Sequence, residues 1–135
     1  MAEYTAFRMM LAPRARVAAV LTNIAELAEW NPALRSVTAP DRVATTGRVY
    51  RVATRVPGPA TLRYAEIGAE RIVWTLTVAG GAETGEWRLR DAALPDGPAT
   101  LVTHTIRHSG PLLRALHRAM RPVPARRLDR LAARL

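Results

Sequence analysis

Regular alternation of apolar and polar residues dominates the middle of this 135-residue chain. Between residues 47 and 108, apolar side chains recur at every second position, which is typical of strands with one covered and one solvated face. Short Gly- and Pro-containing segments separate these runs and indicate turns. Because consecutive strands follow one another through short turns, the pattern predicts an antiparallel meander. Its predicted strands cover residues 47–56, 60–67, 71–78, 83–91 and 99–108.

The N-terminal part begins with a shorter alternating run. Residues 3–11 predict a half-buried strand, and we expect Phe7 and Met9 on its covered side and Tyr4 on its outer side. Pro13 suits the first turn of a helix over residues 14–22.

A second short helix is predicted over residues 24–30. Asn23 followed by Glu26 resembles the capping box that opens helices. Pro32 blocks helix at the residue before it, so the chain must turn at Trp30–Asn31–Pro32. The next run, 34–39, is short, and its pattern does not decide its type, although a strand is the simplest interpretation.

The C-terminal segment, 110–135, predicts a long helix. Pro111 fits its first turn, and apolar residues recur at helical spacing along it. Pro122 and Pro124 are expected to kink or break this helix near residues 118–123. The apolar stripe consists of Leu112, Leu113, Leu116, Met120, Val123, Leu128 and Leu131.

These elements together predict a single α+β domain over residues 1–135. A curved antiparallel sheet of about seven strands would surround the long C-terminal helix, with two short helices after the first strand. In that arrangement every apolar face is buried against another element.

Three stretches of the chain are similar to one family. APRARVAAVLTNIAELAEWNP resembles its first two helices, TGEWRLRDA with ATLVTHTI its late strand pair, and GPLLRALHRAM the start of its last helix. The family is the START-related polyketide cyclase/dehydrase and lipid-transport superfamily (SRPBCC), which has the helix-grip fold. The resemblance covers essentially the whole chain. It implies a cavity for a small hydrophobic molecule between the sheet and the last helix, and it leaves open whether the chain is a cyclase or dehydratase of secondary metabolism or a carrier.

The covered face and the corner around Trp30 supply the candidate ligand-binding residues. Several aromatic side chains with polar ends share this face, and such groups need partners when they are buried, which favours a pocket. Plain core packing is the alternative for each aromatic residue taken alone. The candidates are Phe7, Trp30, Asn31, Tyr50, Tyr64, Trp74, Trp87, His104, Leu116 and Met120.

His104 is the candidate catalytic residue. It lies between Val102 and Ile106 in an alternating strand, so its side chain is expected to point inward. An imidazole can serve as an acid or base near neutral pH, or it can hydrogen-bond a ligand. The alternative is a core histidine whose hydrogen bonds are satisfied within the protein.

No metal site or cofactor is expected. His104 and His108 are four residues apart on a predicted strand, which separates them by about 13 Å. That is too far for one metal ion with bonds of about 2 Å to each nitrogen. The sequence also lacks a Gly-rich phosphate loop and a Gly-x-Ser-x-Gly elbow.

Charge raises one alternative function. The net charge is +9, all 20 basic residues are arginine, and most of the excess lies in residues 110–135. A nucleic-acid or acidic-membrane binder could use such a segment. Against that reading, the segment has no aromatic residues for base stacking and shares its helix with a regular apolar stripe. We therefore expect no nucleic-acid partner.

Cellular location and assembly are less constrained by the sequence. The chain has no cysteine, and its apolar runs fall short of the about 20 residues that span a bilayer, so no stable membrane insertion is expected. The N-terminus does not read as a signal peptide, which favours the cytoplasm. The sequence does not predict the oligomeric state.

Overall fold

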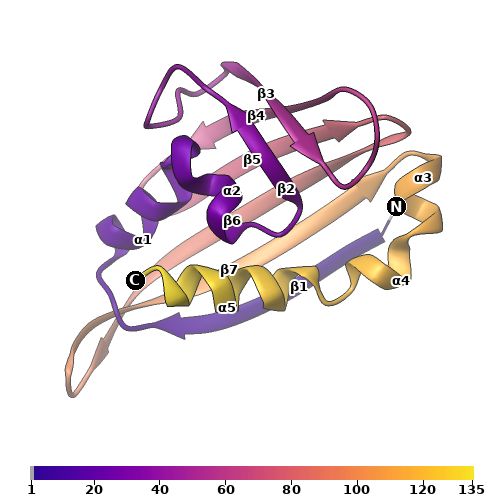
Figure 1. The fold of residues 1–135 in the computed structure, drawn as a ribbon. Coiled ribbons are helices and arrows are strands. Elements are labelled where there is room, and N and C mark those ends of the chain that lie inside the picture. Colours follow the sequence, from indigo (N-terminus) through magenta and orange to yellow (C-terminus); the bar gives the residue numbers. More distant parts are fainter. Residues whose placement is uncertain (1) are drawn as a thin grey trace.

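A seven-stranded antiparallel sheet forms the body of the molecule in a computed structural model that describes residues 2–135. The strand order is β1-β7-β6-β5-β4-β3-β2. Helices lie over one face of this curved sheet, with α5 running across it (Figure 1). This is the predicted helix-grip architecture. The strands are β1 (Ala2–Met10), β2 (Leu34–Thr38), β3 (Val49–Thr54), β4 (Ala60–Ile67), β5 (Arg71–Val78), β6 (Gly81–Leu94) and β7 (Gly97–Ser109).

The two N-terminal helices are α1 (Arg14–Thr22) and α2 (Leu27–Trp30), with a 3-10 turn at Ile24–Glu26 between them. The predicted cap is present, because Asn23 Oδ1 accepts a hydrogen bond from the backbone N–H of Glu26 at 3.3 Å. Residues 34–39, whose type the sequence left open, contribute the edge strand β2.

The C-terminal segment is broken twice. It consists of α3 (Pro111–Ala115), α4 (His117–Met120) and α5 (Val123–Ala133). The predicted break at Pro122 is confirmed, whereas the break at Leu116 was not predicted. At the break at Leu116, the ring of His117 donates a hydrogen bond to the carbonyl of Arg114 at 3.0 Å. A side chain thus satisfies a carbonyl at the end of α3.

The predicted orientation of β1 is wrong. Phe7 is 74% exposed and Met9 is exposed, whereas Tyr4 lies on the helix side, where the guanidinium of Arg121 sits over its ring. Arg8 also faces that side and pairs with Asp129 of α5. The physical reason is that β1 is an edge strand beside α5. Its helix-side row buries Met10 and brings Arg8 to Asp129, and the other row, with Phe7 and Met9, faces solvent. Alternation alone does not reveal this.

The interior strands follow their predicted faces. Trp74, Trp87 and Ile106 are buried beneath the helices, whereas Arg88 and Arg107 lie on the outer face. Among the helices of residues 2–135, none is both long enough and apolar enough to cross a bilayer.

Candidate functional site

An open cleft of about 480 Å³ lies between the sheet and the three C-terminal helices. Its walls come from the ends of β3 and β5, from the turn before β2 and from α3, α4 and α5. Two of these helices, α3 and α4, are only five and four residues long. The cleft is lined by Pro32, Ala33, Thr54, Arg55, Val56, Leu76, Val78, Glu83, Leu113, Leu116, Ala119, Met120, Val123, Arg126, Arg127 and Arg130.

A buried ion pair forms part of the wall of this cleft. Glu83 of β6 and Arg127 of α5 are nearly inaccessible to solvent. Arg127 donates from Nη1 to Glu83 Oε2 at 2.7 Å and from Nη2 to Oε1 at 3.0 Å. Trp74 adds a hydrogen bond from Nε1 to Glu83 Oε2 at 3.3 Å. This two-pronged geometry fixes α5 to the middle of the sheet.

The pair keeps Glu83 ionised. Burial by itself would raise the pKa of the Glu83 carboxyl, but the charge and hydrogen bonds of Arg127 outweigh it and hold the pKa well below its usual range. Glu83 is the only carboxylate in the cleft lining. It carries no proton to donate at neutral pH.

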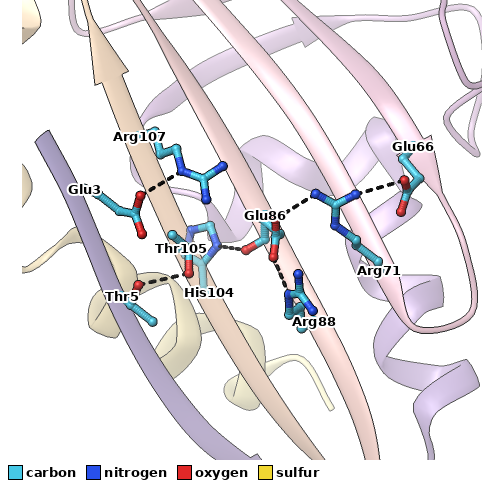
Figure 2. Close-up of polar contacts among 9 residues, drawn as sticks. All are labelled: Glu3, Thr5, Glu66, Arg71, Glu86, Arg88, His104, Thr105 and Arg107. Atoms are coloured by element: carbon cyan, nitrogen blue, oxygen red, sulfur yellow. Dashed lines mark hydrogen bonds and ion pairs between the residues drawn. The ribbon is translucent and has the colours of Figure 1, made fainter. Parts of the chain in front are cut away.

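His104 lies in the same interior cluster and has no exposed surface. Its Nδ1 is 3.0 Å from the backbone carbonyl oxygen of Glu86 (Figure 2). Because a carbonyl only accepts, Nδ1 carries the proton, and Nε2 accepts from Arg127 Nη1 at 3.2 Å. The ring also stacks on Trp87 at 3.6 Å between centroids. Both nitrogens are thus occupied by protein groups.

This environment keeps His104 neutral. Burial and the nearby charge of Arg127 lower the pKa of His104 to about 3. The partners of the imidazole are therefore a backbone carbonyl and an arginine. Glu86, whose carbonyl holds the ring, points its own carboxylate to the outer face, where Arg71 and Arg88 bind it (Figure 2).

Four of the six aromatic residues predicted to bind a ligand are packed in the core instead. Tyr50, Tyr64, Trp74 and Trp87 are each at most 1% exposed, and none lines the cleft. Tyr64 donates its hydroxyl to the carbonyl of Leu21 at 2.6 Å. Tyr50 donates to Asp41 at 2.9 Å. Because the protein satisfies these hydroxyls itself, they need no ligand, and the prediction that these side chains and His104 line a cavity is corrected.

Leu116 and Met120 do line the cleft, at the position predicted from the apolar stripe. Phe7 does not, because it lies on the opposite face of the sheet. Trp30 and Asn31 line a second cleft of about 480 Å³ beside the first. Asn31 Oδ1 accepts from the backbone N–H of Ala33 at 3.1 Å, which explains the amide before Pro32 as a turn former.

Glu83, Arg127 and His108 were not among the predicted residues. Glu83 shares the inward row of β6 with Gly85 and Trp87, so its register was a usable signal. Arg127 lies four residues from both Val123 and Leu131 of the apolar stripe. His108 is buried, and its Nε2 lies 3.8 Å from Glu83. The sequence signal for this cluster was a charged residue at a position where the periodicity predicts an apolar one, as at Glu83 and Arg127.

Residues 2–135 contain no group of three or more His, Cys, Asp or Glu side chains arranged to hold a metal ion.

Comparison with known families identifies the architecture. The family described as polyketide cyclase / dehydrase and lipid transport matches residues 1–135. The chain belongs to this family. No curated protein matches the sequence.

Several solved structures are similar to this chain in fold but distant from it in sequence. The Zhui aromatase/cyclase from Streptomyces sp. R1128 has a TM-score of 0.75 at 18% identity, covering 98% of this chain and 92% of its own. A protein of Thermus thermophilus has a TM-score of 0.67 at 20% identity, covering 98% and 96%. A protein from the dynemicin biosynthetic locus has a TM-score of 0.67 at 18% identity, covering 97% of this chain and 46% of its own. At these identities the likeness shows the shared fold.

Proposed function

We propose that this SRPBCC protein binds a small, largely apolar molecule in the cleft between the sheet and α3–α5. The observation that carries the proposal is the cleft itself, whose walls are mostly apolar and include Leu76, Leu116 and Met120. Pockets of this size and composition suit small-molecule ligands. The family description and the aromatase/cyclase likeness support the same reading.

The groups around the cleft favour binding over acid–base catalysis. Glu83 is ionised and held by Arg127, and His104 keeps its proton on Nδ1 with its other nitrogen occupied. Neither group has a free site for proton transfer near neutral pH. We therefore propose a carrier, or a template that folds a flexible chain by shape alone. The catalytic role predicted for His104 becomes a positioning role, in which His104 orients Arg127.

Some arginines of the C-terminal segment have partners within the fold, which weakens the case for nucleic-acid binding. Arg127 is buried against Glu83, Arg121 covers Tyr4, and Arg134 lies near Glu26 and Glu29. Three of the seven arginines in residues 110–135 are thus engaged by the fold. The absence of a nucleic-acid partner stays a prediction, as does a location in the cytoplasm.

Filling the cleft tests the proposal. Ala119 is exposed and lines the cleft, whereas Ala115 is exposed and does not. Naphthamide, a neutral aromatic probe, should bind wild type and Ala115→Trp equally in a fluorescence titration. Ala119→Trp should weaken binding by about tenfold or more, the equivalent of roughly 1.4 kcal/mol of lost contact. Equal binding to Ala119→Trp, or none to wild type, would contradict the proposal.

A further inference from the structure

The second cleft gathers arginines from three separate elements. Arg35 comes from β2, Arg55 follows β3, and Arg130 comes from α5. Arg55 and Arg130 also line the apolar cleft, so the two spaces share a boundary. A ligand in the apolar cleft would therefore lie next to Arg55 and Arg130, and Arg35 lines the adjoining cleft.

These three arginines lack acidic partners. Within residues 2–135, neither Arg35, Arg55 nor Arg130 has a carboxylate oxygen within 4.0 Å. The one carboxylate in the lining, Glu29, has Arg134 at 3.8 Å. Like charges converging on one concave surface repel one another and attract anions.

An unpaired donor adds a second observation. Trp30 lines this cleft and is 3% exposed, and its indole Nε1–H has no hydrogen-bond partner in the described structure. Buried indole N–H groups ordinarily have one. The indole Nε1–H of Trp87, in the core, has no partner among the described residues either, so the three arginines are the main indication of an anion site.

We propose that the second cleft is an oxyanion site that binds the charged end of an amphiphilic ligand. The ligand would carry a carboxylate or phosphate beside Arg35, Arg55 and Arg130, and its apolar body would occupy the neighbouring cleft. The guanidinium group of arginine can donate two parallel hydrogen bonds to either a carboxylate or a phosphate. This inference rests on the proposed function and adds the ligand's chemical class to it.

Matched probes distinguish binding in the apolar cleft from recognition of an oxyanion in the second cleft. Naphthoate and naphthyl phosphate add an oxyanion to the ring system of neutral naphthamide, which is close in shape to naphthoate. Each anion's affinity is divided by that of naphthamide for the same protein, so that effects on the apolar cleft cancel. Arg63→Gln is the control, because Arg63 is exposed on β4, has no ion pair and lines neither cleft.

At least one anion should bind wild type more tightly than naphthamide, and added salt should reduce that advantage. Arg35→Gln, Arg55→Gln and Arg130→Gln should each lower the affinity ratio by about two- to fivefold, and Arg63→Gln should leave it unchanged. The anion with the larger ratio identifies carboxylate or phosphate as the preferred group.

Two results would overturn the inference. If naphthamide binds in the cleft and neither anion binds better, the oxyanion site is wrong while the proposed function stands. The same conclusion follows if Arg63→Gln lowers the ratio as much as Arg35→Gln, since general surface charge would then explain the preference. If no probe binds, the inference fails together with the proposed function.

Discussion

Arg127 is the residue on which the interior polar groups converge. It binds Glu83 with two hydrogen bonds, donates to His104 and lies over the ring of Trp74. Isolated charges are very costly to bury, but a paired and hydrogen-bonded set is tolerated. The set links α5 to β5, β6 and β7, so it fixes the helix that forms one wall of the cleft.

His104 gives this cluster a testable dependence on pH. Its folded pKa is about 3, whereas an unfolded histidine titrates near its ordinary value of about 6.5. Between these values the unfolded chain binds a proton that the folded chain does not. Stability must therefore fall as pH falls through this window, by up to about 1.4 kcal/mol per pH unit from this residue.

The variant His104→Gln should lose that contribution. Its amide can donate to Glu86 and accept from Arg127, but it does not titrate. Urea unfolding at several pH values below 6.5 should give a flatter dependence of stability on pH for the variant than for wild type. Parallel curves would show that His104 is already protonated in the folded protein.

At the scale of elements, β1 shows where periodicity fails as a guide. An edge strand under the rim of a helix has a helix-side row that is only partly covered, so charged residues such as Arg8 can occupy it when a partner such as Asp129 is near. The outer row then tolerates an aromatic residue. Sequence alternation identified the strand but not its inward face.

Truncating one residue from each row of β1 tests this assignment. Phe7 is 74% exposed and Met10 is 1% exposed. Phe7→Ala should change the free energy of unfolding by no more than about 0.5 kcal/mol. Met10→Ala should cost about 2–5 kcal/mol, because it leaves a cavity in the core. A larger cost at Phe7 than at Met10, measured by urea unfolding, would restore the orientation expected from sequence.

The interior strands were predictable because their two rows differ clearly in polarity. Trp74 and Trp87 were placed on the correct side by alternation. Alternation predicts the face of the sheet on which a side chain lies, but it does not predict how deeply that side chain is buried. It therefore did not distinguish a packed core residue from one that lines a pocket. The position of the cleft depends on the breaks at Leu116 and Pro122, and only the proline break has a clear sequence signal.

At the scale of the whole molecule, the packed core and the cleft occupy different parts of the sheet–helix space. The aromatic cluster of Tyr64, Trp74 and Trp87 fills the part beneath α1, α2 and α5. The part bordered by α3, α4 and α5 is left open and lined by smaller apolar residues together with Glu83 and four arginines. The packed half stabilises the fold, and the open half is the cleft in which we propose that a ligand binds.

The most direct test of this account is the location of a bound probe. Amide chemical shifts of isotope-labelled protein, followed by NMR during titration with naphthamide, report which residues the probe approaches. We predict that the largest changes fall on Leu76, Val78, Leu116, Met120 and their neighbours along the cleft. Changes centred on the outer face of the sheet, or no changes at saturating probe, would contradict the claim that this cleft is the binding site.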